Sequence, residues 1–231
     1  MTTLIVCAPG CSSHLGRSGL AAMVNMVRKE APPGVRVVDA YLREQQPTLA
    51  DVIAETTGQR IVVPVLLGHD DRLLADIDAA VGARRDVLVT APVGPDWPLA
   101  EVSVQRMIEA GARPSDTIVM LAETATGERA VEDLGKAARL LSAVWGGRVH
   151  VGAMSGVGPP VADTLDIARA YGKRIVVSVY AWTSEHLARE LAALGADVVT
   201  APLVGPQVEQ RLVDTVLARA FSRGSWARVA L

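Results

Sequence analysis

The chain has 231 residues, of which half are apolar, and its formal net charge is −2. A chain of this size can bury a substantial core in one or two α/β domains. The near-neutral charge argues against a phosphate-tracking surface, and the 3% of aromatic residues argue against a base-stacking platform, so we expect no nucleic-acid partner. No apolar run is long enough to span a bilayer, and the N-terminus lacks the regions of a signal peptide. We therefore expect a soluble, cytoplasmic protein with no membrane partner.

The most informative stretch is TLIVCAPGCSSH at the start of the chain. Its apolar residues 4–7 predict a strand, and the helical pattern that follows begins near Arg17. A loop between a strand and a helix is where α/β proteins bind ligands. Cys7, Cys11 and His14 are all residue types that bind soft metals, although their spacing matches no standard zinc motif.

The next elements alternate in the same way. The first helix ends near Lys29, residues 35–42 form a second strand, and Pro47 opens a second helix. Residues 60–67, RIVVPVLL, are apolar on both faces, as in the middle of a parallel sheet, and Pro64 predicts a break near the end of that strand.

A second loop of interest, at 68–71, follows this strand and contains His69, Asp70 and Asp71. Because a helix begins directly after it, the two carboxylates are more readily explained as helix caps than as metal ligands. A fourth strand is predicted at 86–91 and a further helix at about 98–110.

The second half of the chain repeats the first. TIVMLA at 117–122 matches TLIVCA at 3–8, and VAD at 161–163 matches LAD at 49–51. RIVV at 60–63 recurs at 174–177, and TAP at 90–92 returns at 200–202. Four matches in the same order indicate duplication of an α/β unit. We predict two tandem, pseudo-symmetric, Rossmann-like domains at 1–112 and 115–231, each a mostly parallel four-stranded sheet flanked by helices. A cleft is expected between them, since small-molecule sites favour domain interfaces.

With both halves read, the chain resembles the class II chelatase family, above all its two-domain actinobacterial-type members. These sirohydrochlorin cobalt- and ferrochelatases insert a divalent metal into a tetrapyrrole. The resemblance rests on phrases that run nearly end to end: TLIVCAPG, AYLREQQPTLADVI, RIVVPVLLGHDDRLLADI and TAPVGP, then MLAETATGERAVEDL, PPVADTL, RIVVSVY and GADVVTAPLVGP. It implies a chelatase-like fold, a tetrapyrrole ligand and cobalt or iron as the metal substrate. It suggests no organic cofactor.

Two histidines of the family's pattern are absent. The first strand of family members ends in Ala-His-Gly, where this chain has Ala8-Pro9-Gly10, and Arg72 stands where the resemblance places the second histidine. In the family these imidazoles are understood to hold the metal or accept pyrrole protons. Proline has no side-chain donor or acceptor, and arginine has no acceptor, so neither can do this work.

Nearby residues offer a replacement site. We hypothesise a displaced metal site formed by Cys7 or Cys11 with His14 and His69, helped by Asp70 or Asp71, with His14 and His69 as the catalytic bases. Loops of this length can fold back far enough to bring them together. The alternative is that Cys7 packs as a small apolar residue and that the other side chains are ordinary loop residues.

Other side chains are candidates for holding the macrocycle. Arg72 is suited to pairing with its carboxylates, although a solvated arginine at a helix start is equally expected. Ser12 and Ser13 in the first loop, and His186 after the repeated RIVV strand, complete the predicted substrate-binding set. His150 lies on a predicted strand and is not expected to be a ligand.

Two functions remain open on this sequence. The first is a chelatase with a rearranged metal site, and the second is a tetrapyrrole- or metal-binding carrier or sensor that has lost chelatase activity. A nucleotide-binding Rossmann domain is disfavoured because Gly10 and Gly16 do not form the required glycine-rich loop. Either a monomer or a homodimer is compatible with the pattern.

Overall fold

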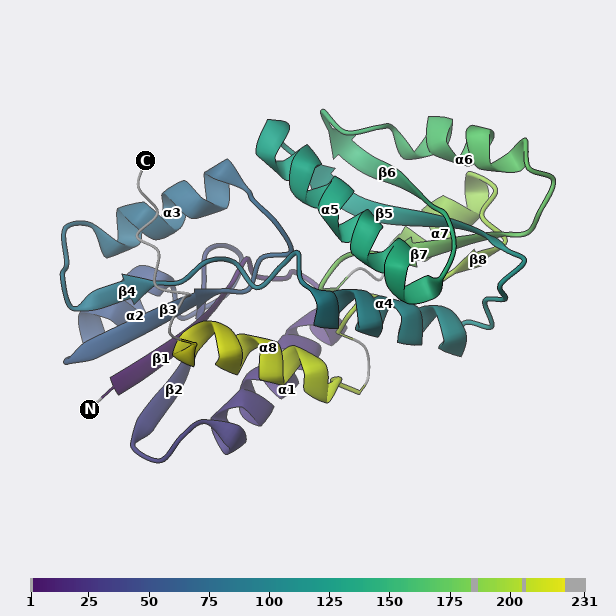
Figure 1. Ribbon diagram of the computed structural model, residues 1–231. Coiled ribbons are helices and arrows are strands. Elements are labelled where there is room, and N and C mark those ends of the chain that lie inside the picture. Colours follow the sequence, from purple (N-terminus) through teal and green to yellow (C-terminus); the bar gives the residue numbers. More distant parts are fainter. Residues whose placement is uncertain (1, 184–186, 205–206, 223–231) are drawn as a thin grey trace. The chain divides into compact units, whose positions relative to one another are not determined.

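The computed structural model describes residues 2–183, 187–204 and 207–222 (Figure 1). The chain divides into two compact units. The first unit comprises Met1–Gly94 with Gln207–Leu231, and the second comprises Pro95–Pro206. The predicted domains at 1–112 and 115–231 follow the sequence repeat, whereas the compact units exchange the last helix of each repeat.

The first unit contains one sheet of four parallel strands in the order β2-β1-β3-β4 within the described residues. Its elements are β1 (Thr2–Ala8), α1 (His14–Glu30), β2 (Val35–Tyr41), α2 (Leu49–Glu55), β3 (Gln59–Pro64), α3 (Asp71–Val81), β4 (Val87–Val89) and α8 (Gln210–Phe221).

Helices cover both faces of this sheet. Ile5 and Cys7 of β1 point to the face where Ile53 of α2 and Ile77 of α3 are buried. Helices α1 and α8 pack against each other, α1 against β2 and α8 against β3, so they cover the opposite face (Figure 1). The result is a three-layer α/β/α unit, with apolar residues on both faces of its central strands.

The second unit repeats this arrangement in the strand order β6-β5-β7-β8. Helices α4 and α5 pack against each other on one face, and α6 and α7 contribute to the core cluster on the other. The elements are α4 (Trp97–Glu109), β5 (Thr117–Ala125), α5 (Glu128–Trp145), β6 (Val149–Gly156), α6 (Val161–Arg169), β7 (Ile175–Val179), α7 (Leu187–Ala193) and β8 (Val198–Val199).

The predicted fold class is confirmed: each repeat supplies four parallel strands of an α/β sheet. The third strand ends at Pro64 instead of Leu67, because proline cannot donate a ladder hydrogen bond. Helix α1 begins at His14, three residues before the predicted start, because Ser13 caps it. No helix among the described residues is long and apolar enough to cross a membrane.

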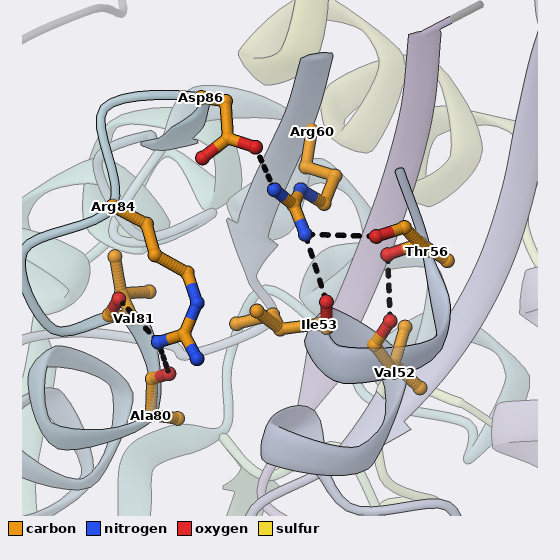
Figure 2. A network of polar contacts seen from close by, with 8 residues as sticks. All are labelled: Val52, Ile53, Thr56, Arg60, Ala80, Val81, Arg84 and Asp86. Carbon is orange, nitrogen blue, oxygen red and sulfur yellow. Dashed lines mark hydrogen bonds and ion pairs between the residues drawn. The ribbon is translucent and has the colours of Figure 1, made fainter. Parts of the chain in front are cut away.

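Arginines satisfy the carboxyl ends of two helices in the first unit (Figure 2). Arg60, at the start of β3, donates to the carbonyl oxygens of Ile53 at 2.7 Å and Thr56 at 2.9 Å, and also pairs with Asp86. Arg84 donates to the carbonyl of Val81 at 3.0 Å. The last carbonyls of a helix have no partners within the helix, so these guanidinium groups stabilise the ends of α2 and α3.

Candidate functional site at the carboxyl edge of the first sheet

The predicted site residues follow strands that end at one edge of the first sheet. The ends of β1 and β2 are in register, with Ala8 beside Tyr41, and Cys7 of β1 pairs with Pro64 of β3. The loops after these three parallel strands therefore emerge at the same edge. We call this the carboxyl edge of the first sheet; it comprises the loops at 9–13, 42–48 and 65–70. In open α/β sheets this edge is the usual place for ligands.

The first loop leads directly into α1. Ser13 accepts a hydrogen bond at its Oγ from the backbone N–H of Gly16 at 3.0 Å and so caps the helix. The Cys11 thiol lies 3.4 Å from the same Oγ. His14 is the first helical residue, not a loop residue as predicted, and is exposed, as is Ser12. Thus a thiol, two hydroxyls and an imidazole lie around the amino end of one helix.

The second loop, at 42–48, is hydrogen-bonded to the first. The backbone N–H of Arg43 donates to the carbonyl of Pro9 at 3.0 Å, and the Gln45 side chain accepts from the N–H of Cys11 at 2.7 Å. Gly10 has φ +103°, and a Cβ there would lie 1.9 Å from the carbonyl oxygen of Arg43. Only glycine permits so close an approach, so the two loops form a single rigid platform.

The third loop holds His69 and Asp70 beside the start of α3. The Asp70 carboxylate accepts from the N–H groups of Arg72 and Leu73, both at 3.0 Å, which confirms the capping explanation for Asp70. His69 Nε2 lies 2.9 Å from the Asp71 carboxylate. A carboxylate can only accept, so the His69 ring donates from Nε2 in this contact.

An ion pair joins the second loop to α3. The Arg43 guanidinium contacts the carboxylate of Asp76, with Nη2 at 2.8 Å. The hydrogen bond and charge of Asp76, with a smaller contribution from Asp70, raise the pKa of Arg43. Sequence reasoning missed both Arg43 and Gln45, because no motif identifies them. The signal that the sequence offers is their position directly after β2, which ends at the same edge of the sheet as β1.

The predicted metal ligands have unequal surroundings. Cys7 is fully buried in β1, where desolvation raises the pKa of its thiol to about 12. It is therefore a neutral thiol and a poor ligand, because the thiolate is the metal-binding form. Among the described residues no group of three or more His, Cys, Asp or Glu side chains is gathered closely enough to hold a metal ion. The displaced metal site thus stays a prediction.

The corresponding edge of the second unit carries two hydroxyl groups that contact each other. The hydroxyls of Thr124 and Ser155 lie 2.7 Å apart, and Ser155 also donates to the carbonyl of Glu123 at 3.2 Å. Trp182 Nε1, after β7, is buried without a hydrogen-bond partner among the described residues. His150 lies on β6 as predicted, where burial and then Arg148 lower its pKa. His186, predicted to bind substrate, lies outside the described residues.

Comparison with known proteins gives a family match over part of the chain and a fold shared over most of it. Residues 3–110 match the model of the CbiX family, and no curated protein sequence matches the chain. Among solved structures, SirB from Bacillus subtilis with Fe3+ superposes with a TM-score of 0.75 and 17% identity, over 97% of this chain and 98% of that one.

Two further structures are similar. The sirohydrochlorin chelatase SirB from Bacillus subtilis subspecies spizizenii, in complex with cobalt, has a TM-score of 0.72 and 17% identity, over 95% of this chain and 93% of that one. CbiX, described as the terminal enzyme of siroheme biosynthesis in denitrifying bacteria, has a TM-score of 0.65 and 18% identity, over 94% and 99%. At these identities the likeness establishes the shared fold.

Proposed function

We propose that this chain is a CbiX-family protein that binds a sirohydrochlorin-type tetrapyrrole and inserts a divalent metal, cobalt or iron, into it. The observation that carries the proposal is the family match over residues 3–110, which includes every loop of the carboxyl edge of the first sheet. The fold shared with SirB and CbiX over nearly the whole chain supports it.

The loops of the first unit offer the groups that such a reaction needs. Exposed Arg72 is suited to pair with a carboxylate of the macrocycle, and the hydroxyls of Ser12 and Ser13 can donate to further oxygens. Metal insertion releases two pyrrole protons for each divalent ion taken up. The imidazoles of His69 and His14 are the bases we assign to these protons.

The metal ion enters as a substrate and leaves within the product. We assign its transient capture to Cys11, His14 and His69, whose sulfur and nitrogen atoms suit cobalt(II) and iron(II). The buried neutral thiol of Cys7 takes no part in this assignment, and Asp70 already uses one oxygen to cap α3.

The second candidate function is tetrapyrrole binding without insertion. One observation favours it: the described residues hold no assembled group of three metal-ligating side chains. A carrier or sensor needs the carboxylate contacts but not the metal capture. The two functions therefore share the macrocycle and differ in the fate of the metal.

An anaerobic two-step titration separates them. Metal-free sirohydrochlorin is added first while its visible bands are followed, and one equivalent of cobalt(II) is added afterwards. A chelatase binds the macrocycle and then converts it to the cobalt form faster than a protein-free control. A carrier binds it but leaves the insertion rate at that of the control. If no band shifts when the macrocycle is added, both functions are excluded.

A further inference from the structure

The ion pair between Arg43 and Asp76 has an incomplete geometry. Nε and Nη2 of Arg43 both donate to one oxygen, Oδ2, at 3.3 and 2.8 Å. The strongest guanidinium–carboxylate pairs instead use two parallel hydrogen bonds, one to each oxygen. Both side chains are also about half exposed, at 51% and 45%. An exposed pair of this kind contributes little to stability and can be exchanged for a better partner.

The backbone of Arg43 is nevertheless held in place. Its N–H donates to the carbonyl of Pro9, its own carbonyl accepts from Gln45 at 2.7 Å, and Gly10 packs against that carbonyl. Only the side chain of Arg43 is therefore free to change partner. Its base is fixed on the loop that carries Cys11, Ser12 and Ser13.

A second arginine lies next to the same carboxylate. Arg72 and Asp76 are four residues apart on α3, and such residues are neighbours on one helix face. Within the part of the chain that the structure describes, no carboxylate forms an ion pair with the Arg72 guanidinium. Asp76 is thus one carboxylate with two arginines in its neighbourhood.

We infer that Arg43 and Arg72 form a two-arginine clamp for a carboxylate of the ligand, and that Asp76 holds Arg43 while the ligand is absent. This clamp deepens the proposed function, on which it rests, because it assigns the site to a polycarboxylate ligand and names Arg43 as a specificity-determining residue. On binding, a ligand carboxylate replaces Asp76 on Arg43 and accepts from Arg72 as well. No covalent bond is made or broken.

Asp76 competes with the ligand carboxylate for Arg43, so removing the charge of Asp76 should strengthen ligand binding. Dissociation constants are measured for sirohydrochlorin and, separately, for benzenehexacarboxylate, which tests the clamp without a macrocycle. We expect Asp76→Asn to lower both Kd values about three- to tenfold and Arg43→Gln to raise them about tenfold. The double variant Arg43→Gln/Asp76→Asn should bind no more tightly than Arg43→Gln alone, because Asp76 acts only through Arg43.

Matched controls carry the same charge changes elsewhere in the first unit. Asp78→Asn lies on the same helix, and Arg36→Gln lies on β2. The clamp is overturned if Asp76→Asn leaves binding unchanged or weaker, or if Arg43→Gln has no more effect than Arg36→Gln. If benzenehexacarboxylate follows the expected pattern while sirohydrochlorin does not bind, the clamp stands and the proposed function fails. Circular dichroism verifies that each variant is folded.

Discussion

Arg106 of α4 donates a hydrogen bond from Nη2 to the carbonyl oxygen of Leu203, at 3.3 Å, in the loop after β8. Arg219 of α8 makes the equivalent bond in the first unit, to the carbonyl of Val93 at 3.2 Å after β4. Both carbonyls follow a Thr-Ala-Pro sequence. The last helix of each sequence repeat is therefore bonded into the compact unit that contains the strands of the other repeat.

This exchange predicts which fragment of the chain folds. We expect residues 95–206 to unfold cooperatively on their own, because they include α4, which packs against α5 and β7. Residues 115–231, the sequence repeat, lack α4 and carry α8, whose buried Leu212 and Val216 belong to the first unit. Thermal unfolding followed by circular dichroism compares them. A more stable 115–231 fragment would instead favour the domain boundaries predicted from the repeat.

Gly10 is expected to resist substitution. In Gly10→Ala the new methyl group meets the carbonyl oxygen of Arg43 in a backbone conformation with φ +103°, and we expect a loss of about 2–4 kcal/mol of unfolding free energy. Gly111 is the matched control: its φ is +76°, but nothing lies within 4 Å of the added atom. Gly111→Ala should cost about 1 kcal/mol. Equal losses in denaturant titrations would contradict the close approach of the two loops.

The buried arginine of Figure 2 should matter more than its acidic partner. The Arg60 side chain is 7% exposed and its loss leaves the carbonyls of Ile53 and Thr56 without a donor, so Arg60→Leu is expected to cost about 2–4 kcal/mol. Asp86 is 52% exposed, and Asp86→Asn should cost less than about 1 kcal/mol. Chemical denaturation measures both. The reverse order would mean that the ion pair, and not the helix end, is what Arg60 stabilises.

The two thiols should differ in reactivity. Burial raises the pKa of Cys7 from 9.0 to about 12, so its thiol stays neutral in the folded protein. At pH 8 we expect a disulfide reagent to modify Cys11 alone in the native chain and both cysteines after unfolding. Cys11→Ser is the control and should leave no reactive thiol in the native chain. Rapid modification of Cys7 in that variant would contradict its burial.

The same shift has a consequence for stability. A thiol whose pKa is raised by folding stabilises the native state fully below its unfolded pKa, near 9, and loses that contribution as the pH rises towards 12. We expect Cys7→Ala to reduce the loss of stability across this range. Unfolding free energies of both proteins at pH 8 and pH 10.5 test the sign, and an unchanged pH dependence would exclude Cys7 as its source.

The fold was largely predictable from the sequence because its evidence is local and repeated. TLIVCA lies in β1 and TIVMLA lies in β5, as predicted. Strand β3 ends at Pro64, because proline has no N–H to donate to the next hydrogen bond of the sheet. The predicted start of α1 was wrong because the first turn carries no buried apolar residue before Gly16, so apolar periodicity alone cannot detect this turn. The cap formed by Ser13 was the available signal.

The exchange of α4 and α8 between the units, and the hydrogen bonds between the loops after β1 and β2, could not be predicted from the sequence. An amphipathic pattern in α4 states that one face is buried but not against which sheet. Likewise Arg43 reaches Asp76, 33 residues later, only because the loops after β1 and β2 are bonded together. The side chains predicted at the carboxyl edge share only residue types suited to metal binding, and their assembly around a metal remains a prediction.

The most direct measurement of the central claim is the number of turnovers in cobalt insertion. Sirohydrochlorin and cobalt(II) are supplied anaerobically in large excess over the protein, and the cobalt product is counted per chain. We expect many equivalents per chain, formed faster than without protein. The double variant His14→Ala/His69→Ala should reduce the rate to that of the control, while His150→Ala on β6 should keep the wild-type rate. Product that stops at one equivalent per chain, or forms no faster than in the protein-free control, would contradict it.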